Sequence, residues 1–301
     1  MPKRPCAILV TPDNKTIICG DKFGDVYSLP LLPESDAESL STNATAMTRE
    51  TSKAKPFTPT ATNLTVHTAR NRKALEAQLK QKNLHTKTKE PLKFEHQVLL
   101  GHISMLTDVH FFAKRLDGAT RDFIITADRD EHIRISRGPP QAHIIERFCL
   151  GHEEFISKLC VLPEHDMLVS GGGDDWLGFW DPYSGRLQHK CDLKAVVSGA
   201  TKEQSSNLNG EGNIAVSGIW PVSTDLVANK SGEPSSGTML LVTSERLSAL
   251  IAVTIDQADA RRAFPTSVLG LPGYPLDIIV CESSIIVSLD MPEVCTLDHA
   301  V

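Results

Sequence analysis

The sequence of 301 residues lacks a long hydrophobic run. No stretch of about 18 consecutive apolar residues occurs, which excludes a transmembrane helix. The basic start, MPKRPCAILV, is followed at once by Thr11 and Pro12, and its apolar part is too short for a secretory signal. We therefore expect no contact with a membrane.

Paired cysteines and a strong excess of either charge are also missing. The seven cysteines are odd in number and contain no C-x-x-C pair, so we expect reduced thiols, as in cytosolic or nuclear proteins, rather than disulfides or a zinc site. A net charge of -6 argues against nucleic-acid binding by the whole surface, so any such contact would be local. The composition, 41% hydrophobic and 23% charged, is typical of a soluble globular protein.

The composition changes twice along the chain and divides it into three parts. Residues 1–33 and 94–301 contain short runs of strand-forming residues, such as TIICGD (16–21) and ISKLCVL (156–162). Residues 34–93 are rich in Ser, Thr, Lys and Ala and have almost no β-branched aliphatic residues. Because such a stretch buries too little apolar surface to offset the entropy of ordering, we expect this insertion to be disordered.

The insertion contains a cluster of basic residues. Between positions 70 and 90 it has seven Lys and Arg residues against two Glu residues. One interpretation is a solvated, charged linker. The other is a basic arm that contacts phosphates or a partner, with Arg70, Arg72 and Lys73 as candidate nucleic-acid contacts.

An internal repeat is visible in the third part. The dipeptides Gly101-His102 and Gly151-His152 stand 50 residues apart, and each precedes a run of strand-forming residues. The segments DFIITADRDEHIRIS (122–136) and DMLVSGGGDDWLGFWD (166–181) follow them. When these segments are aligned, two hydroxyl residues coincide, Thr126 and Ser170. Asp130 then coincides with Asp174, and Ser136 coincides with Trp180.

The repeated residues predict a buried chain of hydrogen bonds, which we call the relay. A histidine before the first strand, a turn Asp, a strand Ser or Thr and a strand Trp can satisfy one another in series. We expect one relay of His152, Asp174, Ser170 and Trp180, and a shorter one, without an indole, of His102, Asp130 and Thr126. We interpret these histidines as structural rather than as metal ligands or catalytic groups.

The repeated unit resembles the WD repeat of β-propellers, in which four strands recur every 40–45 residues or so. We therefore predict an all-β fold, a WD-repeat β-propeller. The residues outside the insertion suffice for about five to six blades. A propeller must close to hide its edge strands, so we expect either that the downstream blades diverge strongly or that the sequence is incomplete at one or both ends. The abrupt start beside a strand favours missing N-terminal sequence.

Several segments are more specific than the repeat. ADRDEHIRIS (127–136), FCLGHEEFIS (148–157), DKFGDVYSL (21–29) and SGIW (217–220) resemble the non-catalytic WD-repeat subunits of eukaryotic tRNA (guanine-7)-methyltransferases. The resemblance covers about residues 5–33 and 94–290 and implies a seven-bladed propeller in the nucleus. It also implies a heterodimer with the catalytic subunit, which this chain binds and stabilises for 7-methylguanosine formation in the tRNA variable loop. The chain would then be no enzyme, would carry no cofactor, since S-adenosylmethionine belongs to the partner, and would contact tRNA through the complex.

The resemblance places partner binding on one rim of the propeller, where the turns DRDEH (128–132) and GHEEF (151–155) of adjacent blades are expected to be neighbours. The candidate residues are Arg129, Glu131, His132, Arg134, Glu153 and Phe155. Arg134 is the principal candidate, because its long side chain can carry the guanidinium to the rim from a half-buried Cα position. Arg134 is also a candidate contact for tRNA. The alternative for Arg134 is an ion pair between blades.

Other functions stay open. A generic WD-repeat scaffold, such as a ubiquitin-ligase substrate receptor or a chromatin adaptor, has the same fold. An enzymatic role has little support in the residues. The GGG at 171–173 has no helix after it to receive a phosphate, and no set of acidic and histidine ligands for a propeller hydrolase stands out.

Overall fold

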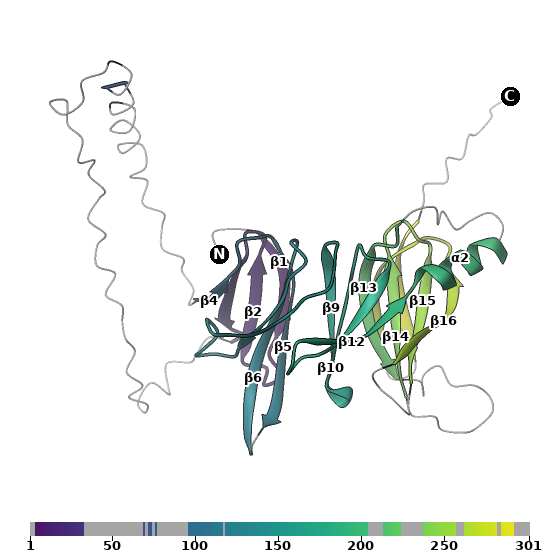
Figure 1. Cartoon of the computed structure of the whole chain (residues 1–301), viewed down its shortest axis with the longest axis horizontal. Coiled ribbons are helices and arrows are strands. Elements are labelled where there is room, and N and C mark those ends of the chain that lie inside the picture. The colour runs from purple at the N-terminus through teal and green to yellow at the C-terminus, as the bar shows by residue number, and fades with distance from the viewer. Residues whose placement is uncertain are drawn as a thin grey trace. The chain divides into compact units, whose positions relative to one another are not determined.

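The structure, a computed structural model, describes residues 4–32, 69, 72–73, 76, 96–116, 118–203, 213–223, 237–256, 262–281 and 284–291. Its contacts divide the chain into two units (Figure 1). One comprises Met1–Leu31 with His96–Val301, and the other is Leu32–Glu95. The second unit begins and ends within two residues of the insertion expected at 34–93. The predicted disorder of that insertion lies outside the described residues.

Almost all of the first unit is β-strand. The first sheet contains β1 (Pro5–Val10), β2 (Thr16–Asp21), β3 (Asp25–Pro30) and β4 (Gln97–Gly101), and the second contains β5 (Leu106–Leu116), β6 (Ala119–Asp128), β7 (Ile133–Arg137) and β8 (Ile145–Cys149). The third contains β9 (Ile156–Leu162), β10 (Met167–Gly172), β11 (Trp176–Asp181) and β12 (Arg186–Asp192). The fourth contains β13 (Val216–Ser223), β14 (Thr238–Ser244), β15 (Ala249–Ile255) and β16 (Ala263–Gly270), and β17 (Tyr274–Val280) pairs with β18 (Ile285–Asp290). A short 3-10 helix, η1 (Pro163–His165), and one α-helix, α2 (Lys194–Glu203), interrupt the strands.

Each sheet is an antiparallel meander, because strands that follow one another in the sequence are neighbours in the sheet. The insertion is the one long interruption of a described sheet. It separates β3 from β4, yet these two strands pair directly, with Asp25 opposite Gly101 and Tyr27 opposite Val98. The first sheet is therefore completed by residues that follow the insertion.

The hydrophobic core lies between consecutive sheets. Ile124 and Ile125 are neighbours on β6 and point to opposite faces, as the two-residue period of a strand requires. Ile124 packs in a cluster with Ile18 of the first sheet, whereas Ile125 packs with Leu168 and Trp180 of the third. The second sheet is thus covered by the first sheet on one face and by the third on the other, as blades cover one another in a propeller.

These observations confirm the predicted all-β WD-repeat β-propeller, with four complete four-stranded blades and the β17–β18 pair in the described residues. Strands predicted at 16–21 and 156–162 coincide with β2 and β9. No helix among the described residues is long and apolar enough to cross a membrane.

The cysteines of the described residues are free thiols, as expected. Burial raises the pKa values of Cys149, Cys160 and Cys191 to about 12, with nearby Asp residues adding to the shift. These three side chains therefore act as small apolar core residues rather than as reactive thiolates.

Candidate functional site

The third blade contains the four-membered relay that the repeat predicts. His152 Nδ1 lies 2.6 Å from Asp174 Oδ2, and His152 Nε2 lies 2.7 Å from Ser170 Oγ. The indole Nε1 of Trp180 donates to the same Ser170 oxygen at 2.7 Å. Ser170 and Trp180 are fully buried, so this chain of bonds satisfies polar groups that water cannot reach.

The relay has one direction. Trp180 donates to Ser170, and the serine hydroxyl can then donate to His152 Nε2, which leaves Nδ1–H to donate to the Asp174 carboxylate. This order requires a neutral imidazole. Burial lowers the pKa of His152, against the raising effect of Asp174, in agreement with that state.

The relay of the second blade uses a different aspartate from the one predicted. His102 Nδ1 lies 3.0 Å from Asp128 Oδ2, and His102 Nε2 lies 2.8 Å from Thr126 Oγ1. Asp130, expected in this role, is exposed in the turn, and its main-chain N–H donates to Asp128 Oδ1 at 3.0 Å. The prediction for Asp130 was wrong, and Asp128 is the relay carboxylate.

The position of Asp128 at the end of β6 explains this correction. Its Oδ1 accepts hydrogen bonds from the main-chain N–H groups of Asp130 and His132, so its Oδ2 is held toward His102. Burial by itself raises the pKa of the Asp128 carboxyl, but the hydrogen bonds from His102 and these N–H groups outweigh it, and the net pKa is lowered. One carboxylate therefore holds both the turn and the histidine.

The third blade cannot place its carboxylate at the corresponding position. Counted from the relay hydroxyl, that position is Gly172, where a Cβ atom would lie 1.8 Å from the carbonyl oxygen of Phe155. The carboxylate comes instead from Asp174, whose Oδ1 accepts the main-chain N–H groups of Glu153 and Glu154 at 3.0 and 3.2 Å. The alignment of Asp130 with Asp174 missed this two-residue difference.

Arg134 occupies the place that the third blade reserves for its indole. Arg134 stands opposite Thr126 across β6 and β7, as Gly178 stands opposite Ser170 across β10 and β11. A Cβ atom on Gly178 would lie 2.6 Å from Nε1 of Trp180, so the third blade leaves this space open for the indole. In the second blade the residue at the position of this glycine is Arg134.

The guanidinium of Arg134 is only partly satisfied by the protein. Its Nη1 donates to the carbonyl oxygen of Gly101 at 3.0 Å, whereas its buried Nε has no hydrogen-bond partner among the described residues. Burial lowers the pKa of Arg134, and the nearby Asp128 carboxylate opposes that shift. The hydroxyl of Ser136, in the register of Trp180, is also buried and finds no hydrogen-bond partner in the described part of the chain. No ion pair within the described residues engages Arg134, so the alternative of an inter-blade ion pair has no support there.

The predicted rim residues of the second blade lie around this arginine. Arg129 and Glu131 are exposed in the turn after β6, and Glu131 adopts a φ of 69°. The His132 side chain is half exposed, and its Nδ1 lies 3.6 Å from Asp128 Oδ1. The main-chain N–H of Arg129 donates to Met105 O at 2.9 Å, which ties the turn to the loop that contains His102.

The rim residues of the third blade lie at the same end of the propeller. Leu159 N–H of β9 donates to Asp108 Oδ2 of β5 at 2.9 Å, so the two strands lie side by side and begin at the same end. The side chains of Glu153 and Phe155 are exposed there. Asp108, which sequence analysis missed, is thus a direct link between the second and third blades.

Two of the candidate nucleic-acid residues of the insertion are described. Arg72 and Lys73 are helical and exposed. Arg70 lies outside the described residues.

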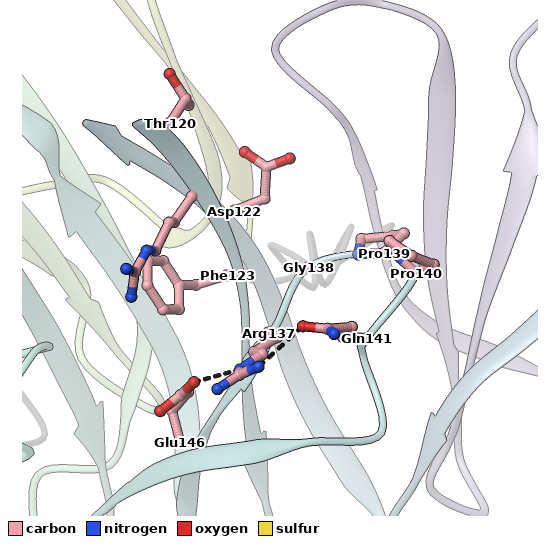
Figure 2. A pocket seen from close by; sticks show the side chains of 10 residues that line it. Thr120, Asp122, Phe123, Arg137, Gly138, Pro139, Pro140, Gln141 and Glu146 are labelled. Atoms are coloured by element: carbon pink, nitrogen blue, oxygen red, sulfur yellow. Dashed lines mark hydrogen bonds and ion pairs between the residues drawn. The ribbon is translucent and has the colours of Figure 1, made fainter. Parts of the chain in front are cut away.

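Two adjoining cavities open near the other ends of β6 and β7. The larger, of 410 Å³, contains Thr120, Asp122 and the turn at Gly138–Gln141 in its wall (Figure 2). The smaller, of 240 Å³, shares Phe123 and Glu146 with it. In the larger, Arg137 pairs with Glu146 and donates to Gln141 Oε1 at 2.9 Å. The charges of Arg137 and Glu146 thus neutralise each other. Across the described part of the chain, no group of three or more His, Cys, Asp or Glu residues could hold a metal ion.

Comparison with known proteins adds a family to this geometry. Residues 1–299 match the model of the tRNA methyltransferase TRM82 WD40 domain. The chain is similar to proteins named tRNA (guanine-N(7)-)-methyltransferase non-catalytic subunit TRM82 from Coccidioides immitis, Sclerotinia sclerotiorum and Phaeosphaeria nodorum, with 44%, 48% and 46% identity over 96%, 92% and 94% of this chain. It spans about half of their length: 55%, 50% and 56%. A solved structure of the computationally designed Ika8 protein covers 95% of this chain, and the chain covers 55% of that protein, with 10% identity and a TM-score of 0.47.

Proposed function

Because this chain belongs to the TRM82 WD40 domain family, we propose that it is the non-catalytic partner of a tRNA (guanine-N7)-methyltransferase. In this role it binds and stabilises the catalytic subunit, and the pair forms 7-methylguanosine in the tRNA variable loop. The relatives' shared name, non-catalytic subunit, supports this role, and so does the engagement of the rim histidines in structural relays. S-adenosylmethionine would be bound by the catalytic subunit.

The observation that carries the proposal is the partly satisfied guanidinium of Arg134. A blade that replaces a buried indole by an arginine gives up a neutral hydrogen bond and apolar burial. The arginine bonds only Gly101 O, and its Nε has no partner among the described residues. A carboxylate from a docked subunit would reach the end of the guanidinium, not the buried Nε, and would form a charge-assisted, bidentate pair with its Nη atoms.

The mechanism we propose is stabilisation by binding. A subunit that binds only the folded, active conformation of its partner shifts the population toward that conformation. No group of this chain takes part in methyl transfer. The exposed polar and charged side chains of the rim, those of Arg129, Glu131, His132 and Glu153, would orient the partner and select it.

Contact with tRNA is a second part of the proposal. Arg134 at the junction of the two proteins, with Arg72 and Lys73 of the insertion, would add positive potential where the tRNA backbone passes. We also propose a nuclear location, which imaging of a fluorescent fusion would test.

The test is co-expression with the catalytic subunit of the same organism, followed by size-exclusion chromatography and a methylation assay. We expect a one-to-one complex with higher activity than the catalytic subunit alone. Arg134→Glu should weaken the complex, because it replaces the positive charge that faces the partner's carboxylate by a second negative charge. Arg186→Glu, at an exposed position on β12, should not weaken it.

Two results would contradict the proposal. If the wild-type chain is monodisperse and does not bind the catalytic subunit, the generic WD-repeat scaffold is the better reading. If the complex forms and Arg134→Glu leaves both its affinity and its activity unchanged, the interface assignment fails.

A further inference from the structure

Large apolar side chains are exposed around the loop that contains His102. Ile103 is fully exposed, and Phe23, Met105 and Phe148 expose 51%, 41% and 45% of their surfaces. We call these four residues the apolar row. Exposed apolar residues are ordinary when scattered, but a contiguous set marks an interaction site.

Main-chain hydrogen bonds hold most of the apolar row together. The turn with Phe23 is joined to the next loop by a bond from His102 N–H to Gly24 O of 2.8 Å. That loop, with Ile103 and Met105, is joined to the turn of the second blade by the bond from Arg129 N–H to Met105 O.

The fourth member of the row is reached through the same turn. The ring of Phe148 lies 6.5 Å from that of His132 in an edge-to-face arrangement. His102, buried in its relay, anchors the middle of the row. A surface fixed in this way binds with little loss of conformational entropy.

Gly24 shows how closely the first two loops fit. Its φ of 95° is open to glycine, and a Cβ atom there would lie 2.5 Å from His102 O and 2.7 Å from Ser104 O. The turn that contains Phe23 is therefore in close backbone contact with the loop that contains Ile103. The apolar side chains of Phe23 and Ile103 thus stand on two backbone segments that contact each other directly.

The charges around the row indicate a protein partner rather than RNA. Lys22 and Arg129 flank it with positive charge, but Asp130 and Glu131 lie in the same turn as Arg129, and Glu153 lies exposed on the next blade. A phosphate backbone would be repelled by these carboxylates. An apolar centre with a rim of mixed charge is the composition of a protein–protein interface.

We propose that the apolar row is the centre of the docking surface for the catalytic methyltransferase subunit and supplies most of the affinity. This inference rests on the proposed function, and it assigns different contributions to the apolar and the charged residues of the interface. Ile103 and Met105 hold the partner by apolar burial, whereas Arg134 and the charged turn fix its orientation and speed its association.

The experiment measures the affinity of the purified chain for the purified catalytic subunit by isothermal titration calorimetry. Ile103→Lys combined with Met105→Lys should raise the Kd about tenfold or more. Matched controls are Phe264→Lys and Leu269→Lys, which replace exposed apolar residues on β16 and should leave the Kd unchanged. Because Ile103 is fully exposed and Met105 exposes 41% of its surface, the thermal midpoint of the first variant should stay close to that of the wild-type chain.

The outcomes separate this inference from the proposed function. If the wild-type chain does not bind the catalytic subunit, the proposed function fails, and this inference fails with it. If the wild-type chain binds and the Ile103/Met105 variant binds equally well, the apolar row is not the interface while the proposed function stands. A variant that keeps the subunit but loses tRNA binding would make the row an RNA contact and would also overturn the inference.

Discussion

The guanidinium of Arg134 donates a hydrogen bond to the carbonyl oxygen of Gly101, 3.0 Å away, and so ties the second blade to the loop that enters it. In the third blade the corresponding glycine, Gly151, packs against the indole of Trp180, which would lie 3.3 Å from a Cβ atom there. The same junction is thus closed by an arginine in one blade and by a tryptophan in the next. The first solution leaves a charge near the surface, and the second leaves none.

The first prediction concerns a variant in which the arginine of the second blade is replaced by the glycine and tryptophan arrangement of the third. Arg134→Gly with Ser136→Trp gives the second blade the residues that the third blade has at Gly178 and Trp180. The indole should donate to Thr126 and fill the space of the arginine side chain. We expect a free energy of unfolding within about 1 kcal/mol of the wild-type value, because a buried apolar ring replaces a buried charge.

The exchange variant should nevertheless bind the catalytic subunit more weakly and associate with it more slowly, because it lacks the charge of Arg134. Urea unfolding and calorimetric binding, measured on one preparation, check the two parts. Arg134→Gly alone is the control, since it leaves the cavity unfilled and should be clearly less stable than the exchange variant. Unchanged binding by the exchange variant would show that Arg134 serves only the fold.

The second prediction concerns the two aspartates of the DRDEH turn. Asp128→Ala removes the partner of His102 and the acceptor of two main-chain N–H groups, so it should lower the free energy of unfolding by about 2–3 kcal/mol. Asp130→Ala changes an exposed side chain and should cost no more than about 0.5 kcal/mol. Urea denaturation of both variants measures the difference, and equal costs would refute the assignment of Asp128 to the relay.

The third prediction is a two-step loss of stability in acid. His152 has a pKa below its ordinary value of 6.5, so its unfolded form binds protons more readily, and its contribution is complete above pH 6.5 and lost as the pH falls below it. Asp108 and Asp128 have pKa values below 3.8, so their contributions persist to about that pH and are lost below it.

Thermal midpoints measured from pH 8 to pH 3 should therefore be flat down to pH 6.5, fall once below it, and fall again below pH 4. His152→Gln should be less stable at pH 8 and should lack the first fall, while the second remains. If the thermal midpoint of this variant falls below pH 6.5 by as much as that of the wild-type chain, a group other than His152 causes the fall.

The sequence allowed the fold and one relay to be predicted, because both depend on local spacing. A Gly-His dipeptide, a hydroxyl, an Asp and a Trp at fixed distances are enough to place His152, Ser170 and Trp180 in one blade. The relay of the second blade was predicted with the wrong Asp, because the choice depends on space. Only the close approach of Phe155 O to Gly172 moves the carboxylate to Asp174 in the third blade, and nothing there obstructs Asp128 in the second.

Contacts between distant segments were the least predictable features. The pairing of β3 with β4 across the insertion, and the bond from Leu159 to Asp108 between blades, join residues whose spacing carries no signal. The exposure of Ile103 was also missed, because an isoleucine after Gly-His is indistinguishable in sequence from a core residue. Its position on the rim follows from the turn of the loop, which the sequence pattern does not reveal.

The pairing of β3 with β4 has a consequence for how the molecule could be made. The chain leaves the first sheet at Pro30 and re-enters it at Gln97, and β3 and β4 pair directly although the insertion separates them in the sequence. The first three strands are held to the rest by this ladder and by apolar contacts of Ile18 and Val26 with Leu106. Residues 1–32 and 96–301 are therefore the natural halves of a split protein, two polypeptides that could be expressed separately and would rebuild one blade on meeting.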